Sequence, residues 1–303
     1  MYFNYYSVIS KILFRAELSI IGTVIIVGFY LIFKVKYSKK KILCGKTALV
    51  TGGSNGLGQQ ICIKLAQQGC NVIIADISSA SKTMLKLQPY KIKSREYKID
   101  VSNYEEILKM REILSDEFEF IDILVNNAGL IPYKTIFEQT SDEIETLTKV
   151  NLNSVIFMTK CFIEKMIENG TGHIVTISST QGIYAFPYSL NYCASKFAVT
   201  GFMLGLKEFL RRQQLKGIDT TCILPNVMST RKDIIDIVNE KRTLIFSADK
   251  CAETIIKAII NRQSFVTIPM YYGLIISVFN ILPFSIQHFI RDFIMREDLF
   301  LKK

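Results

Sequence analysis

Two residues in the second half of the chain are spaced for acid–base chemistry. Tyr192 and Lys196 are four residues apart, which puts both side chains on one face of a helix. A tyrosine ordinarily has a pKa of about 10, too high for an efficient base at neutral pH, but a nearby ammonium favours the phenolate and lowers that pKa. Ser179 ends an apolar run thirteen residues earlier, and its hydroxyl could hold the reacting oxygen. Together the three residues predict proton exchange with an alcohol or a carbonyl.

A further polar residue, Asn151, interrupts a long apolar helical pattern. A buried asparagine needs hydrogen-bond partners. One interpretation is that Asn151 holds a water molecule that links Lys196 to solvent as a proton relay. The other is a core asparagine whose partners are all structural. A Y-x-x-x-K spacing is often a plain helix face, and Ser179 could be a turn residue like its neighbour Ser178, so the order of the motifs matters more than any one of them.

A glycine-rich turn precedes these residues at 51–58, with the sequence TGGSNGLG. It follows a short apolar run and opens a helical pattern. Glycines let the backbone turn sharply and approach a pyrophosphate, and the amides of the following helix then point at the anion. We expect this turn to contact a nucleotide through Gly52, Ser54, Asn55, Gly56, Leu57 and Gly58.

The residue that ends the next predicted strand bears on the identity of that nucleotide. Asp76 lies 24 residues after Gly52, where a carboxylate can accept hydrogen bonds from both ribose hydroxyls of NAD and repels the 2′-phosphate of NADP. No basic residue in the glycine-rich turn compensates, since position 55 is Asn. The sequence therefore predicts NAD over NADP, with a plain turn aspartate as the alternative interpretation.

A second short motif, NNAG at 126–129, follows another apolar run. Small residues and amide side chains at the end of a strand let the backbone approach a bound nucleotide and brace the sheet. By itself the tetrapeptide is weak, because any loop can contain Asn and Gly. As part of the series it adds Asn127, Ala128 and Gly129 to the expected cofactor contacts.

These residues need a scaffold that gathers the ends of several strands. From residue 46 onward, apolar strands alternate with amphipathic helices, and several strands are unbroken apolar runs, as in a parallel sheet buried on both faces. The alternation predicts a single α/β domain with a doubly wound, Rossmann-like parallel sheet. Residues 78–94 are expected to form a short helix and a loop. We expect strands at 47–51, 71–76, 95–99, 121–126, 173–178, 219–224 and 265–268, and helices at 57–68, 103–118, 141–167, 190–213 and 248–261.

Taken in order, the motifs resemble the short-chain dehydrogenase/reductase family over residues 46–261. The resemblance implies a catalytic tetrad. In it Tyr192 is the acid and base, and Lys196 binds the nicotinamide ribose and tunes Tyr192. Ser179 would position the substrate oxygen and Asn151 would hold the relay water.

The same resemblance extends the expected cofactor site. It implies that Asp100 and Val101 contact the adenine, and that Pro225, Val227 and Thr230 contact the nicotinamide end. The segments GHIVTISS at 172–179, YCASKFAVTGF at 192–202 and TTCILPN at 220–226 further resemble a membrane-anchored branch that includes retinol dehydrogenases and 17-beta-hydroxysteroid dehydrogenases. That branch implies lipophilic alcohols as substrates, and the family implies pairing of copies into a homodimer.

The composition excludes several other classes of site. The seven cysteines form no C-x-x-C pair, which indicates reduced thiols in a cytosol-facing domain instead of a disulfide scaffold or a zinc site. The chain has only two histidines, so we expect no metal. The net charge of +10 could suggest nucleic acid, but part of the excess lies beside an apolar segment, and a membrane surface is the better explanation.

That apolar segment, residues 18–33, carries no charge and precedes five lysines between 34 and 41. It is slightly shorter than the roughly 20 residues that span a bilayer, although Lys34 and Tyr37 could extend it by reaching the interface. We predict an anchor that spans the membrane or lies in it as a monotopic hairpin, with the basic flank and the rest of the chain in the cytosol. A cleaved signal peptide is the alternative, but no small-residue cleavage site follows.

A second apolar segment lies near the other end of the chain. No Asp, Glu, Lys or Arg occurs from 263 to 290, and Pro269 and Pro283 divide this stretch into pieces too short to span a bilayer. It could be a substrate lid or an interfacial patch that dips into lipid. It could equally be an ordinary apolar cap over the core.

We therefore expect three parts: a membrane anchor at 1–41, an NAD-binding catalytic domain at 42–262, and an apolar C-terminal cap or membrane-contacting segment at 263–303. The predicted enzyme interconverts a lipophilic alcohol, such as retinol, a hydroxysteroid or a long-chain alcohol, and its carbonyl at the endoplasmic reticulum membrane or a lipid droplet. One alternative is an NADP-dependent carbonyl reductase, which Asp76 disfavours. Another is a lipid-droplet or reticulum scaffold protein, which would need neither Tyr192 nor Lys196.

Overall fold

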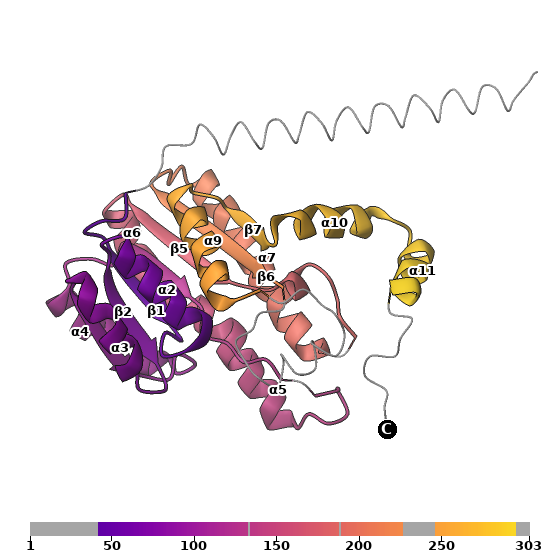
Figure 1. Cartoon of the computed structure of the whole chain (residues 1–303), viewed down its shortest axis with the longest axis horizontal. Coiled ribbons are helices and arrows are strands. Elements are labelled where there is room, and N and C mark those ends of the chain that lie inside the picture. Colours follow the sequence, from indigo (N-terminus) through magenta and orange to yellow (C-terminus); the bar gives the residue numbers. More distant parts are fainter. Residues whose placement is uncertain (1–41, 133, 188, 227–245, 295–303) are drawn as a thin grey trace, which may run out of the picture. The chain divides into compact units, whose positions relative to one another are not determined.

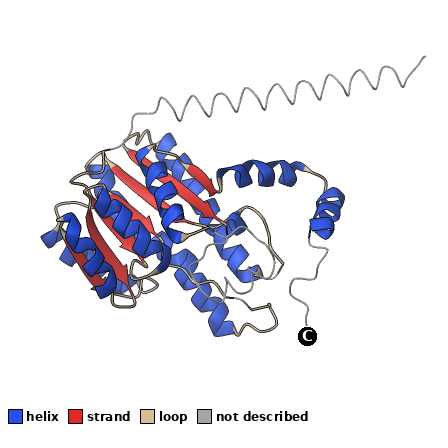
Figure 2. Ribbon diagram, viewed as in Figure 1, coloured by secondary structure: helices blue, strands red, loops and turns tan. Residues whose placement is uncertain are grey.

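The computed structural model describes residues 42–132, 134–187, 189–226 and 246–294. Within them seven strands form one parallel sheet in the order β3-β2-β1-β4-β5-β6-β7 (Figure 2). The first strand, β1, lies inside the sheet; β2 and β3 are added on one side of it, and β4 to β7 follow in order on the other side. This is the predicted doubly wound α/β fold. The strands are β1 (Thr47–Thr51), β2 (Asn71–Asp76), β3 (Ser94–Lys98), β4 (Ile123–Asn126), β5 (Gly172–Ile177), β6 (Ile218–Pro225) and β7 (Phe265–Ile268).

Helices cover both faces of this sheet (Figure 1). Neighbouring residues of β1 show why: Ala48 and Val50 belong to one apolar layer, and Leu49 belongs to the layer on the opposite face. A strand buried on both faces has no polar side to alternate with, which explains its continuous apolar sequence. The first layer is completed by α2 (Gly56–Gln67), α3 (Ser81–Leu87) and α9 (Ala248–Ile260), and the second by α4 (Tyr104–Glu117), α6 (Ser154–Glu168) and α7 (Leu190–Arg212).

The predicted helix at 141–167 is wrong in one respect, because it is not continuous. Helix α5 (Ser141–Thr148) is separated from α6 by a π-helical turn, η2 (Lys149–Asn153). Such turns often occur at functional positions in helices, and this one contains Asn151. No glycine or proline marks the interruption, so the sequence offered no local signal for it.

Other element boundaries differ from the predicted ones by one or two residues. The expected strands at 95–99, 121–126, 173–178 and 219–224 begin or end slightly differently in β3, β4, β5 and β6. The short helix and loop expected at 78–94 correspond to α3 and the 3₁₀ turn η1 (Gln88–Tyr90). Strand β7 extends the sheet to Ile268, so the apolar C-terminal helices begin only after it.

Those two helices are α10 (Met270–Ile281) and α11 (Phe284–Ile294). Pro269 immediately precedes the first helix and Pro283 the second, so the two prolines divide the apolar stretch as predicted. Helix α10 buries only Ile276, and its apolar exposed residues are Met270, Tyr271, Leu274, Ile275, Val278 and Ile281. None of the helices within the described ranges has the length and apolarity that crossing a bilayer requires. The predicted anchor at 1–41 lies outside the described residues.

Candidate active site

A cleft of about 520 Å³ lies where the glycine-rich turn meets the carboxyl ends of the central strands. This is the position at which open parallel sheets bind ligands, where the order of strands reverses. Residues from motifs far apart in the sequence meet there. The predicted residues that line the cleft are Gly52, Asn55, Gly56, Leu57, Gly58, Asp76, Asp100, Val101, Asn127, Ala128, Gly129, Tyr192 and Lys196.

The glycine-rich turn has the backbone shape that a phosphate needs. Gly56 begins helix α2 with a φ of 55°, a left-handed conformation that side chains disfavour. At Gly58 an added Cβ would lie 2.0 Å from the carbonyl oxygen of Gly52 and 2.5 Å from Nδ2 of Asn127. A side chain is therefore excluded at Gly58 and disfavoured at Gly56, and the N-terminus of α2 lines the cleft.

Asp76 ends β2 and holds the turn in place. Its Oδ2 accepts a hydrogen bond from the backbone N–H of Ser54 at 2.9 Å, and its Oδ1 accepts one from Ser78 N–H at 2.9 Å. The side chain lines the cleft, and Lys196 is the only basic residue among the described residues that line it. Lys98 is paired with Asp76 on the neighbouring strand β3 but does not line the cleft, so the lining offers a 2′-phosphate no cation near Asp76 and fits NAD.

The two asparagines of the NNAG motif have different tasks. Asn127 donates from Nδ2 to the carbonyl oxygens of Thr51 and Gly52, at 3.0 and 3.1 Å, and so ties its loop to the glycine-rich turn. The backbone N–H groups of Asn127 and Ala128 both donate to Oγ1 of Thr51 at 3.0 Å. Asn126 is buried and donates to Thr159 and Thr176 below the cleft. The motif therefore braces the sheet, as predicted.

Tyr192 and Lys196 occupy the first turns of α7 and are both buried. The ammonium nitrogen of Lys196 lies 5.7 Å from the centre of the Tyr192 ring and donates to the carbonyl oxygen of Ile177 at 3.0 Å. Burial of the ammonium lowers the pKa of Lys196 to about 8. A cation is therefore held beside a buried phenol at the inner end of the cleft.

The two serines after β5 are distinguished by their partners. Ser178 donates to the carbonyl oxygen of Lys196 at 3.1 Å and bonds Oγ1 of Thr200 at 2.8 Å, so it fastens α7 to the sheet. Ser179 accepts from the N–H of Gln181 at 3.2 Å and lies 3.5 Å from the carbonyl oxygen of Pro225. Ser178 lines the cleft as well, whereas Ser179 is not one of its lining residues.

Asn151 is fully buried, and its side chain is occupied by two partners. Its Nδ2 donates to the carbonyl oxygen of Leu130 and to Oγ of Ser195, and its Oδ1 accepts from Leu130 N–H at 2.7 Å. An added Cβ on Gly129 would lie 3.3 Å from Oδ1 of Asn151 and 3.6 Å from Nζ of Lys196. The residue therefore shapes the loop next to Lys196, and its role in a water relay stays a prediction.

Not every predicted contact lines the cleft. Ser54, a buried residue of the turn, and Pro225, the last residue of β6, are not among the residues that line it. Val227 and Thr230 lie outside the described residues. The structure adds Leu130, Ile131, Thr146 and Val150 to the wall. Leu130 directly follows NNAG and could have been found from that motif, whereas Thr146 is brought in only by the approach of α5.

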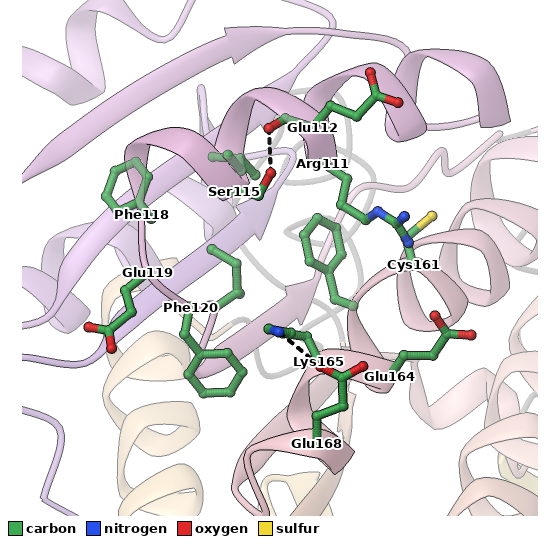
Figure 3. A pocket seen from close by; sticks show the side chains of 13 residues that line it. Arg111, Glu112, Ser115, Phe118, Glu119, Phe120, Cys161, Glu164, Lys165 and Glu168 are labelled. Carbon is green, nitrogen blue, oxygen red and sulfur yellow. Dashed lines mark hydrogen bonds and ion pairs between the residues drawn. The ribbon is translucent and has the colours of Figure 1, made fainter.

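A second hollow of about 330 Å³ lies between the C-terminal ends of α4 and α6 (Figure 3). Its floor is apolar and includes Phe118 and Phe162, and its rim carries charges that include the Lys165–Glu168 pair at 2.8 Å. None of the residues predicted to carry chemistry lines it. We therefore place the candidate active site in the larger cleft.

Comparison with known proteins agrees with this geometry. The family model described as short chain dehydrogenase matches residues 46–235. The chain belongs to the short-chain dehydrogenase family. This confirms the family predicted from the motifs, and the protein is thereby an oxidoreductase.

Its curated relatives carry names from the branch that the sequence resembles. Human estradiol 17-beta-dehydrogenase 11 is 29% identical over 249 residues, covering 81% of this chain and 82% of the relative. Human 17-beta-hydroxysteroid dehydrogenase 13 is 27% identical over 263 residues, covering 85% and 87%. Mouse epidermal retinol dehydrogenase 2 is 28% identical over 270 residues, covering 87% of each chain.

Solved structures support the fold of this family member. A short chain dehydrogenase/reductase from Burkholderia phymatum, in complex with NAD, superposes with a TM-score of 0.69 at 21% identity, covering 75% of this chain and 90% of that chain. A short chain dehydrogenase from Mycobacterium paratuberculosis, bound to NAD, has a TM-score of 0.66 at 18% identity, covering 75% and 97%. The Rossmann-like sheet is thus shared with enzymes whose sequences have diverged widely.

Proposed function

We propose that this protein is an NAD-dependent oxidoreductase that interconverts a lipophilic alcohol and its carbonyl. The observation that carries the proposal is that one cleft is lined by both Asp76 and the Tyr192–Lys196 pair. A carboxylate at the end of β2 suits the ribose of NAD, and a buried tyrosine beside an ammonium suits proton exchange with an alcohol.

Bound NAD would accept the hydride that leaves the alcohol carbon. Tyr192 takes the hydroxyl proton, because the nearby ammonium of Lys196 stabilises the phenolate that can receive it. Ser179 donates a hydrogen bond to the substrate oxygen and holds it near Tyr192. In the reverse direction Tyr192 returns the proton to the carbonyl oxygen. The ratio of oxidised to reduced cofactor sets the direction.

The proposed substrate class rests on the exposed apolar surface of α10 and on the names of the relatives, which refer to estradiol and retinol. Helix α10 contacts the loop that follows Ser179: Asn280 donates to the carbonyl oxygen of Ile183 at 3.0 Å, and Phe279 packs edge-on against Tyr184. An apolar alcohol released from a lipid surface at α10 would pass the loop at 183–184 on its way to Tyr192.

We further propose that α10 and α11 rest on a lipid surface, at the endoplasmic reticulum or a lipid droplet, with the catalytic domain in the cytosol. In α11, Phe284 and Phe289 are 77% and 71% exposed, and in α10, Ile281 is 83% exposed. A helix that is apolar around most of its surface needs an apolar neighbour, and α10 is too short to span a bilayer. The uncharged segment at 18–33 and its lysines support the same placement.

The test of the activity is NADH formation by the full-length protein in vesicles, measured by absorbance with retinol, hydroxysteroids and long-chain alcohols. We expect turnover with one of these classes and its loss in Tyr192→Phe, while the Kd for NAD stays unchanged. Tyr90→Phe is the matched control, because that tyrosine is remote from the cleft and its hydroxyl contacts only the exposed Gln67 side chain among the described partners. Full activity of Tyr192→Phe would refute the assignment.

A further inference from the structure

A glutamine outside every predicted motif joins the two halves of the reacting centre. Gln181 lies in the 3₁₀ turn η3 (Thr180–Gly182), two residues after Ser179. Its backbone N–H donates to Oγ of Ser179 at 3.2 Å. Its side-chain Oε1 accepts from Oγ of Ser189 at 2.6 Å and from Sγ of Cys193 at 3.2 Å. One residue thus contacts Ser179 and the first turn of the helix that carries Tyr192.

Ser189 bonds Gln181 with a hydroxyl that could otherwise cap helix α7. It precedes the first residue of α7, the position where a serine side chain ordinarily caps the exposed N–H groups of a helix. Ser189 makes no such capping bond, and its hydroxyl is directed to Gln181 instead. The N-terminus of α7 therefore lacks the stabilising side-chain cap that Ser189 could supply, and the same hydroxyl links α7 to Gln181.

The residue on the other side of Tyr192 is held in a similar way. The side-chain amide of Asn191 donates to Oε1 of Gln139, in the segment that precedes α5. Cys193 is held by Gln181 and by the backbone of Phe186, whose N–H donates to Sγ at 3.3 Å. Both neighbours of Tyr192 are therefore fixed by side-chain hydrogen bonds from segments outside α7.

The turn that carries Gln181 has no room to move inward. An added Cβ on Gly182 would lie 2.5 Å from Oγ1 of Thr200 and 2.6 Å from Oγ of Ser178. The backbone of η3 therefore rests directly on α7 and on the end of β5. Because its backbone is seated in this way, the side chain of Gln181 meets Ser189 and Cys193 from a defined direction.

We propose that Gln181 is a positioning residue that sets the distance and orientation between Ser179 and Tyr192. The inference rests on the proposed function, in which these two hydroxyls meet the same substrate oxygen. Loss of the Gln181 side chain leaves both hydroxyls present but frees the first turn of α7 from η3. Small misplacements of reacting groups lower the rate of chemistry far more than they lower binding.

The test compares the full-length wild type with Gln181→Ala in vesicles. The control is Gln213→Ala, an exposed glutamine at the far end of the same helix. We expect kcat of Gln181→Ala to fall about 10- to 100-fold with little change in KM or in the Kd for NAD. Thermal stability should change little, because the hydroxyl of Ser189 becomes free to cap α7. Ser189→Ala combined with Gln181→Ala should lower kcat no further than Gln181→Ala alone, since both remove the same bond.

Hydrogen exchange gives a readout that needs no substrate. In Gln181→Ala we expect amides in 183–193 to exchange at least about tenfold faster while the rest of the domain is unchanged. Gln181→Glu retains an acceptor oxygen and should keep the slow exchange. Unchanged kcat, unchanged local exchange, or a general loss of stability with wild-type kcat would each overturn the proposal. If the wild type itself turns over no alcohol, the proposed function fails. In that case the hydrogen-exchange measurement alone decides whether Gln181 holds the first turn of α7.

Discussion

The ammonium of Lys196 donates to the carbonyl oxygen of Ile177, the last residue of β5, at 3.0 Å. This bond fixes a cation at the carboxyl end of a central strand, where water is largely excluded. Burial disfavours the charged form of the amine, and it therefore lowers the pKa of Lys196 to about 8. The site thus keeps a destabilising group where its charge acts on Tyr192.

That cost predicts a specific pH dependence of stability. Below pH 8 Lys196 is protonated in both the folded and unfolded states, and burial of its charge lowers the free energy of unfolding by its full amount. Between about pH 8 and 10.5 the unfolded state binds more protons, so the free energy of unfolding rises with pH. Lys196→Met lacks this contribution. The wild type should therefore gain about 3 kcal/mol relative to the variant between pH 7 and 10.5.

Denaturant unfolding of both proteins at several pH values measures this difference. The comparison cancels the titration of the other lysines and of the tyrosines remote from Lys196, which both proteins share. Parallel stability curves would show that the buried amine keeps an ordinary pKa. The same variant should lose alcohol oxidation by at least about 100-fold, because Tyr192 loses its neighbouring cation.

Replacement of Asp76 should change the choice between cofactors. Its carboxylate accepts two backbone N–H groups and, in the proposed complex, the ribose hydroxyls. Hydrogen bonds to a charged group are worth about 1.5–3 kcal/mol, so Asp76→Ala should lower kcat/KM for NAD by about 10- to 100-fold. The value for NADP should fall less or rise. Glu96→Ala, in the adjacent strand β3, is the control, and an unchanged ratio of the two kcat/KM values would exclude the ribose contact.

A tryptophan can report whether α10 meets lipid, because the chain contains none. Tyr271 is 51% exposed on α10, and Ile113 is 47% exposed on α4. In full-length protein reconstituted in phosphatidylcholine vesicles, Tyr271→Trp should show blue-shifted emission and quenching by brominated lipid. Ile113→Trp should show neither. Identical, water-like emission from the two variants would place α10 away from the bilayer.

The expected homodimer has a candidate surface on α7. Phe197 and Leu204 are exposed on this helix, at 43% and 52%, and a Cβ added to Gly201 or Gly205 would meet no atom within 4 Å. Small residues between apolar ones allow two helices to approach closely. We expect Leu204→Arg to give a monomer by sedimentation in detergent, while Leu85→Arg on α3 keeps the wild-type mass. A dimer in both variants would exclude this face of α7.

The scaffold could be predicted from the sequence because its signals are local. Strands β1 and β2 coincide with the predicted ranges, since an unbroken apolar run bounded by Gly or Asp is a property of neighbouring residues. The π turn at Lys149–Asn153 could not be predicted in that way. Its residue Asn151 forms hydrogen bonds with Leu130, which is 21 positions away in the sequence. The pattern of residues next to Asn151 does not predict such a contact.

The chain itself determined which chemistry was available and in what order its parts occur: a glycine-rich turn, an acidic strand end, a serine, and a tyrosine with a lysine one helical turn later. Tertiary structure decided the partner of each side chain. It assigned Ser178 to hold α7 and brought Gln181 to Ser189 and Cys193. Apolar periodicity specifies which face of an element is buried, but the direction of a hydrogen bond depends on where distant backbones meet after the sheet has closed.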